Sequence, residues 1–178
     1  ELGLPFLFVL NMMDEAREKG IRIDIPLLES RLGVPVVPTV ATTGEGLDAM
    51  IARLDAARHS GTRVTYPEDI ERAITEIEEL LLDVPRGPRG LAAMMLAGDT
   101  ELMSRLLPQI GLQSAARIQA LSRELSTGLP GSLAGRLTRA RLRLVDRILA
   151  QCTQPAPAKT SPRETLNRVT VHPVWGVP

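Results

Sequence analysis

Two short apolar runs constrain the fold of this 178-residue chain more than any other feature of its sequence. Residues 6–10 are continuously apolar and too short for a buried helix, and residues 34–40, VPVVPTV, form a second run rich in β-branched side chains. Helical patterns follow the first run at 14–19 and 25–32, and another follows the second run from Leu47. Strands that alternate with helices predict a parallel α/β sheet.

The two runs differ in the position that they favour within such a sheet. An uninterrupted apolar run is typical of a central parallel strand that is buried on both faces, so we expect residues 6–10 to be buried. Pro35 and Pro38 remove backbone donors from the second run, which favours an edge or a strand end.

Strand patterns stop after Gly61, and four or five helices are predicted in the rest of the chain. The first, YPEDIERAITEIEELLLDV, carries an apolar stripe of Ile70, Ile74, Ile77 and Leu81. The Pro-rich stretch TQPAPAKTSP, residues 153–162, is typical of a linker. The predicted fold class is therefore α/β plus all-α, divided at residues 1–61, 62–150, 151–163 and 164–178.

Composition supports a folded chain and narrows its class. Hydrophobic residues are 44% and charged residues 24%, which is typical of a globular protein. The single cysteine, Cys152, excludes an intramolecular disulfide and a cysteine cluster for zinc, and we interpret it as an unreactive thiol. No apolar run reaches about 18 residues, so we expect no membrane span here. The start, without Met, and the abrupt ending indicate a piece of a longer protein.

Charge is distributed unevenly although the net charge is zero. Residues 1–84 hold 16 acidic and 8 basic residues, whereas residues 85–178 hold 5 acidic and 13 basic ones. An arginine-rich helix in the second half is either a solvated face or a juxtamembrane contact with anionic lipid, with Trp175 as interface anchor. Nucleic-acid binding is disfavoured because no aromatic platform accompanies the arginines. These arginines are Arg136, Arg139, Arg141, Arg143 and Arg147.

Polar residues follow both predicted strands, where an open parallel sheet binds ligands. The carboxylate of Asp14 could pair with two adjacent donors on the edge of guanine, which adenine lacks. Asn11 could bridge the other edge of the base and tie the two loops together. The small Ala41 and the following Thr42 would let a backbone N–H approach the guanine carbonyl, while Met12 offers an apolar surface to the ring.

A simpler interpretation needs no ligand. Asn and Asp are ordinary helix N-cap residues, so Asp14 could merely cap the helix that follows the strand. The combination of two polar strand ends, 30 positions apart from Asn11 to Ala41, favours base recognition instead.

At these residues the chain resembles the ferrous iron transport protein B family. NMMDEA is similar to the fourth GTPase motif and VPTVATTGEGLDAM to the fifth, and YPEDIERAITEIEELL and RGLAAMMLAGD resemble the family's helical domain, a guanine-nucleotide dissociation inhibitor. TLNRVTVHPVWGVP resembles its approach to the first membrane helix. Two positions depart from the family pattern: Val40 stands where Ser is common, and Asn167 where Asp is usual.

The resemblance implies a function for each segment. Residues 1–61 would be the C-terminal part of a P-loop GTPase domain and 62–150 a helical regulator, with 151–163 as linker and 164–178 as the membrane approach. It implies GTP or GDP as ligand, a location at the cytoplasmic face of the inner membrane, the protein's own channel domain as partner and a homo-oligomer as an option. Mg²⁺ and Fe²⁺ would act only in the complete protein.

Motifs for phosphate chemistry are missing from the 178 residues. Neither G-x-x-x-x-G-K-[S/T] nor D-x-x-G occurs, so we expect no GTP hydrolysis and little nucleotide binding from these residues alone. His59 and His172 stand alone without metal-ligand spacing. Two alternatives stay open: a fragment of another soluble GTPase with a helical effector domain, or a non-enzymatic helical adaptor.

Overall fold

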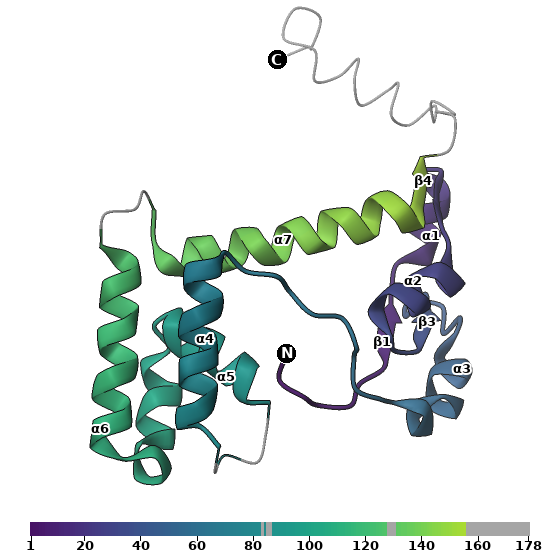
Figure 1. Cartoon of the computed structure of the whole chain (residues 1–178). Coiled ribbons are helices and arrows are strands. Elements are labelled where there is room, and N and C mark those ends of the chain that lie inside the picture. The colour runs from purple at the N-terminus through teal and green to yellow at the C-terminus, as the bar shows by residue number, and fades with distance from the viewer. Residues whose placement is uncertain (83, 85–86, 128–130, 156–178) are drawn as a thin grey trace, which may run out of the picture.

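The computed structural model describes residues 1–82, 84, 87–127 and 131–155. An α/β part and a helical part lie side by side, and the long helix α7 extends across both (Figure 1). This arrangement confirms the predicted fold class. The elements in chain order are β1 (Phe8–Leu10), α1 (Met13–Glu18), β2 (Ile21–Ile23), α2 (Ile25–Leu32), β3 (Val36–Pro38), α3 (Leu47–Ala52), a 3-10 turn (Leu54–Ala56), α4 (Glu68–Leu80), α5 (Pro88–Leu96), α6 (Thr100–Ser126), α7 (Leu133–Cys152) and β4 (Thr153–Pro155).

Strands β1 and β3 pair in parallel, as the sequence predicts. Their register aligns Phe8 with Val36 and Leu10 with Pro38, so the two strands end at the same level. The connection between them contains α1, β2 and α2. Gly33 ends α2 with a left-handed backbone, φ 70°, which lets the chain turn into β3.

The burial of the two strands is the reverse of the expectation. Phe6, Phe8 and Val9 are about two-fifths exposed, whereas Val36 and Val37 in β3 are buried. Among the strands that the structure describes, only β3 pairs with β1, so the other edge of β1 stays uncovered. Pro38 does not place β3 in an exposed position because it is the last residue of the strand.

A second pair of strands was not predicted. β2 pairs antiparallel with β4, aligning Ile21 with Pro155 and Ile23 with Thr153. Helix α7 extends to Cys152, past the predicted boundary at residue 150. The first residues of the predicted linker therefore belong to α7 and to β4. The remaining linker and the segment 164–178, with His172, Trp175 and Asn167, lie outside the described residues.

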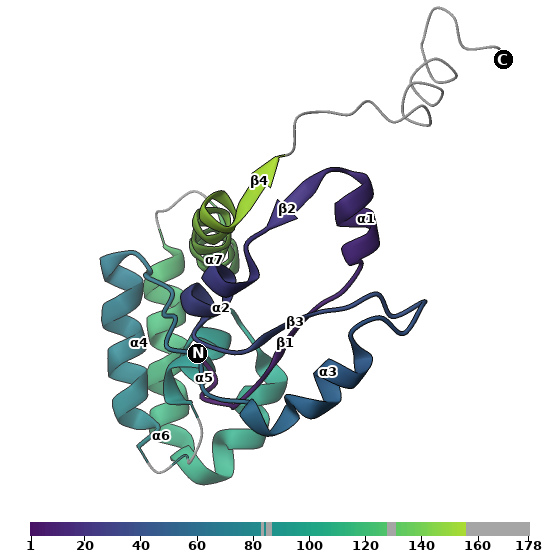
Figure 2. The same ribbon diagram turned by 90° about the vertical axis from the view of Figure 1, so that its right-hand side faces the viewer.

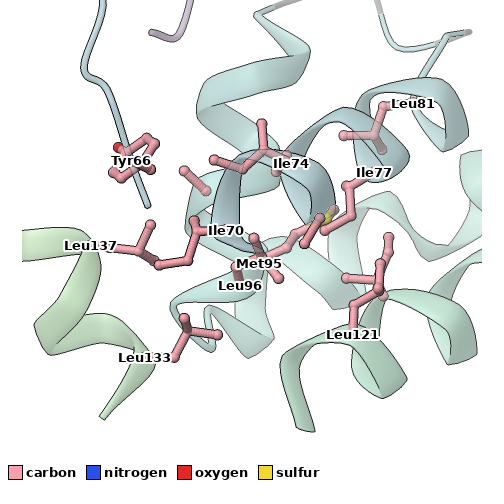
Figure 3. Close-up of a cluster of buried hydrophobic side chains, with 14 of the residues drawn as sticks. Tyr66, Ile70, Ile74, Ile77, Leu81, Met95, Leu96, Leu121, Leu133 and Leu137 are labelled. Atoms are coloured by element: carbon pink, nitrogen blue, oxygen red, sulfur yellow. The ribbon is translucent and has the colours of Figure 1, made fainter. Parts of the chain in front are cut away.

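The helical part has its own hydrophobic core (Figure 3). The predicted stripe on α4 is confirmed: Ile70, Ile74 and Ile77 are fully buried and Leu81 nearly so. They pack against α5, α6 and the first half of α7. Helix α6 is interrupted at Gly111, where the backbone turns to φ 77° and ψ 166°, so it consists of two helical segments.

Helix α7 links this core to a second one in the α/β part. A view along α7 shows its far end beside β2, β4 and α2 (Figure 2). There Cys152 is buried with Leu28 and Val36, and Ile148 packs against them. One helix therefore contributes to both cores. Among the described helices, none is long and apolar enough to cross a membrane.

A buried guanidinium stabilises the entry to α4 and α5. Arg89 donates to both carboxylate oxygens of Glu71, at 2.9 and 2.8 Å, and to the carbonyl of Val64 at 3.0 Å. Burial acts to raise the pKa of Glu71, but hydrogen bonds from Arg89 and from the Tyr66 N–H outweigh it and hold the pKa below its ordinary value. Arg89 also lies 5.5 Å from the centre of the Tyr66 ring.

The first residues of the chain are attached to the helical part around Tyr66. The phenol donates to the Glu1 carboxylate at 3.0 Å and accepts from Arg141 of α7 at 3.1 Å. The backbone of Glu1 also accepts from the N–H of Gly90. A Cβ on Gly90 would lie 2.8 Å from the backbone nitrogen of Leu2, so this close approach requires glycine.

We predict that Ile74→Ala lowers the free energy of unfolding by about 2–5 kcal/mol, because it leaves a cavity in the helical core. Leu82→Ala is the matched control, since Leu82 is 82% exposed, and should change the value by no more than about 0.5 kcal/mol. Urea denaturation of both variants measures the difference. Equal effects would contradict the assignment of this core.

Titration of Tyr66 gives a second prediction, because it is the only tyrosine in the chain. Burial and the Glu1 carboxylate raise the pKa of Tyr66 from 10.0 to about 12. Stability from the protonated phenol is therefore present below pH 10 and lost as the pH rises toward 12. The near-ultraviolet absorbance of tyrosinate should follow that midpoint, and Glu1→Gln should lower it. Tyr66→Phe should abolish both the signal and this alkaline loss of stability.

Candidate functional site

The two strand ends are joined by the side chain of Asn11. Its Oδ1 atom accepts the N–H of Ala41 at 3.0 Å and the hydroxyl of Thr39 at 3.2 Å. Backbone bonds from Met13 N–H to the Thr39 carbonyl and from Thr39 N–H to the Leu10 carbonyl lie beside them. The structure therefore brings the two predicted loops together and places Asn11 at their junction.

Asp14 does not cap its helix. It is the second residue of α1, the N-cap position belongs to Met12, and no side-chain cap hydrogen bond forms. The carboxylate is exposed and has no hydrogen-bond or ion-pair partner within the described part of the chain. The N-cap interpretation is therefore wrong for Asp14. A carboxylate in the first turn is favoured by the helix dipole, but its hydrogen-bonding capacity remains unused.

Met12 has an unusual backbone. Its φ of 66° and ψ of 36° lie in the left-handed region, and it is the only non-glycine residue with positive φ among those described. Such a conformation costs on the order of 1 kcal/mol and is found where the surrounding structure enforces it. The side chain is 53% exposed, next to Asp14. The conformation thus turns the chain sharply between Asn11 and α1.

The loop after β3 offers an unpaired backbone donor at Thr42. The Ala41 N–H is used by Asn11, so it is not the group available to a ligand carbonyl. Thr42 is exposed, and its N–H has no partner within the described residues. Gly46 closes the loop with φ 83°, and a Cβ there would lie 2.3 Å from the Pro38 carbonyl oxygen. Only glycine fits this position.

A solvent-exposed ion pair connects α1 to the loop that follows β3. Arg17 of α1 donates to both carboxylate oxygens of Glu45, at 2.8 and 3.0 Å, and the Val40 N–H donates to the Glu45 carbonyl. Both charged side chains are largely exposed, so the pair adds little stability, but it connects α1 to the loop after β3. Sequence reasoning missed Arg17, Glu45 and Thr39. Thr39 alone carried a signal, since it directly follows β3.

No metal site accompanies these loops in the part of the chain that the structure describes. Within residues 1–82, 84, 87–127 and 131–155, no group of three or more His, Cys, Asp or Glu side chains is arranged to hold a metal ion. His59 is exposed on the segment before α4, and Cys152 is buried in the second core.

Two sequence families match the chain. Residues 1–54 match the family described as ferrous iron transport protein B. Residues 66–154, half of the chain, match the family described as the FeoB cytosolic helical domain.

Curated relatives agree with these matches. The chain is 37% identical over 114 residues to the Fe(2+) transport protein A/Fe(2+) transporter FeoB fusion protein of Porphyromonas gingivalis. It is 36% identical over 103 residues to the Fe(2+) transporter FeoB of Escherichia coli K12. These alignments cover 57% and 56% of the chain but only 13% of each relative.

Solved structures share the fold. The mGMPPNP-bound NFeoB of S. thermophilus superposes with a TM-score of 0.70 at 23% identity, covering 88% of this chain and 60% of that one. The cytosolic domain of L. pneumophila FeoB gives a TM-score of 0.67 at 23% identity, covering 85% and 58%. Since a family match spans half of the chain, the chain belongs to the ferrous iron transport protein B family, FeoB.

Proposed function

We propose that this chain is the guanine-recognition corner and the helical regulator of a GTP-dependent ferrous iron transporter. The observation that carries the proposal is the hydrogen-bond junction at Asn11, which holds two loops so that an unpaired carboxylate and an unpaired backbone donor flank one strand edge. Relatives named Fe(2+) transporter FeoB support the assignment of the cargo.

Each group of the junction has a role in this proposal. The two oxygens of Asp14 accept from the ring N–H and the amino group of guanine, a pair of donors that adenine cannot present. The Thr42 N–H donates to the guanine carbonyl, and Met12 covers one face of the ring. Asn11 positions these groups, because its oxygen is already committed to Ala41 and Thr39.

The exposed apolar residues before and in β1 support a larger α/β domain. A strand edge with large uncovered hydrophobic side chains is a surface on which further strands and helices pack. We propose that the phosphate-binding half of a GTPase domain covers it, since the 178 residues contain no phosphate loop. The residues concerned are Leu2, Leu4, Phe6, Phe8 and Val9.

The helical part is proposed to regulate the nucleotide site through the segment that leads into β1. Glu1, at the start of the segment that leads into β1, is held by Tyr66 and Arg141, while Asn11 directly follows β1. A shift of α7 would therefore pull on β1 and alter the loop that carries Asp14. The helical part acts in this way as a regulator of nucleotide binding, with the state of the site passed on to a membrane channel domain.

Iron transport itself belongs to the complete protein in this proposal. The chain spans 13% of the curated relatives that it matches. Fe²⁺ is the cargo of the transporter, and the described residues lie on the cytoplasmic face of the inner membrane, where GTP is available. GTP hydrolysis is assigned to the domain that the chain completes, together with its Mg²⁺.

We predict that Asp14→Asn changes base preference in the chain joined to a phosphate-binding GTPase half. The amide replaces one acceptor with a donor, so affinity for GDP should fall roughly 10- to 100-fold. Affinity for xanthosine diphosphate should rise, because xanthine carries a carbonyl where guanine has its amino group. Calorimetric titration with GDP and with xanthosine diphosphate measures both affinities. An unchanged preference for GDP over ADP and xanthosine diphosphate would refute base reading by Asp14.

Asn11→Ala separates positioning from base contact. The change leaves the buried Thr39 hydroxyl and the Ala41 N–H without their acceptor, so we expect a loss of about 1–3 kcal/mol in unfolding free energy. Asn11→Asp keeps the acceptor oxygen and should retain most of the stability. Asp14→Ala, with no partner to lose, should stay within about 0.5 kcal/mol of the parent. Thermal or urea unfolding of the 178-residue chain tests all three variants.

A further inference from the structure

Four of the five arginines of α7 fall into two groups in the structure. Arg136 forms an ion pair with Asp69 at 2.6 Å, and Arg141 bonds to Tyr66 and lies 3.5 Å from the Glu1 carboxylate. These two join α7 to its neighbours. Arg143 and Arg147 have another setting, which the sequence pattern does not distinguish.

Arg143 and Arg147 line a cavity of about 440 Å³ between α7 and the segment that leads into α4. The opposite wall carries a third guanidinium, that of Arg63, together with Thr65 and the ring of Tyr66. Apolar atoms of Pro67, Ala140 and Leu144 complete the lining. Three cations from two distant parts of the sequence therefore share one hollow.

No carboxylate neutralises these three groups within the part of the chain that the structure describes. Neither Arg63, Arg143 nor Arg147 has an acidic partner within ion-pair distance, and none of the lining residues is acidic. Glu71 is near enough to interact electrostatically with Arg63, but both of its oxygens are occupied by Arg89. Asp146 precedes Arg147 on α7 but does not line the cavity.

This arrangement places like charges close together on an exposed surface, where an anion can reach all three guanidinium groups. Arg143 and Arg147 are four residues apart on one helix, a spacing at which like charges repel. The Nε of Arg143 donates to the Arg139 carbonyl, which leaves its terminal nitrogens available. By contrast, α5, α6 and α7 each contact α4 through an arginine that forms an ion pair with a carboxylate of α4. These are Arg89, Arg117 and Arg136.

We propose that Arg63, Arg143 and Arg147 form a binding site for a phosphate-type oxyanion. Guanidinium groups match such anions because each presents two parallel N–H donors to two oxygens. Thr65 lies at the same wall and adds a hydroxyl donor. Pro67 and Leu144 contribute apolar atoms to the lining and no side-chain acceptor that would compete with an anion for the guanidinium donors.

Occupancy of the site has a structural consequence. Arg63 belongs to the connection between the α/β part and α4, whereas Arg143 and Arg147 belong to α7. An anion held by all three would bind this connection to α7 and restrict movement between the two parts. The oxyanion comes either from free phosphate or from a phospholipid headgroup, and the same guanidinium chemistry serves both sources.

The test uses the 178-residue chain and inorganic phosphate as first probe, at constant ionic strength with chloride as reference anion. The Nε–Hε resonances of the three arginines should shift saturably with phosphate and not with chloride. Arg143→Gln with Arg147→Gln should weaken binding roughly tenfold or more. Arg123→Gln is the matched control, because this exposed arginine also donates its Nε to the carbonyl four residues earlier and should leave binding unchanged.

Vesicles distinguish the sources. A headgroup ligand predicts that the chain co-sediments with phosphatidylglycerol vesicles but not with pure phosphatidylcholine vesicles. This binding should be lost in the Arg143/Arg147 double variant and kept in Arg123→Gln. Such a result would support a headgroup ligand even where inorganic phosphate binds weakly. Circular dichroism of each variant shows that the fold is retained. Absence of both phosphate and vesicle binding, or an equal loss in Arg123→Gln, overturns the proposal.

Discussion

The parallel register of β1 and β3 is the constraint on which the candidate site depends. Leu10 opposite Pro38 makes both strands end at one level, so the residues that follow them meet. The Oδ1 atom of Asn11 then lies 3.0 Å from the backbone nitrogen of Ala41, although 30 positions separate the two residues. A slip of one residue would turn every side chain of the slipped strand to the other face and would separate this pair. Buried Val36 opposes such a slip, because it would have to leave the second core.

The joint between the two parts combines apolar and polar contacts. Helix α7 takes part in both cores, which ties the orientation of the helical part to β2, β4 and α2. The polar cluster around Tyr66 fixes the orientation of the joint more than it adds stability. The hydrogen bonds of Arg89 to Glu71 and to the Val64 carbonyl mainly offset the cost of removing its guanidinium from water. Such a cluster specifies one orientation because its donors and acceptors match in only one arrangement.

Sequence reasoning identified what local pattern controls. The apolar stripe of α4 and the helix predicted at 25–32 depend on local sequence, and the parallel pairing of β1 with β3 follows from the alternation of strands and helices; all three agree with the structure. It failed where distant partners decide. β2 and β4 are three residues each and pair across most of the chain, and the exposure of Phe8 depends on which strands lie beside it.

The candidate site shows the same division. Its location follows from the rule for strand ends in parallel sheets. The separate roles of its residues do not follow from that rule. The same residue pattern is compatible with an aspartate that caps a helix and with one whose carboxylate faces solvent. Only the positive φ of Met12 places Asp14 beyond the N-cap position. Likewise, the arginines of α7 form one pattern in sequence, but the neighbours that pack against the helix divide them into paired and unpaired groups.

The length of α7 gives the molecule a mechanical property. With 20 residues, the helix is roughly 30 Å long, so a tilt of about 5° about a point in its buried first half would move the far end by roughly 1–3 Å. That displacement approaches the length of a hydrogen bond, whereas the strand pair at that end is only three residues long. A small rotation among the helices would therefore act on the backbone pairing of β2 with β4 through a long lever arm.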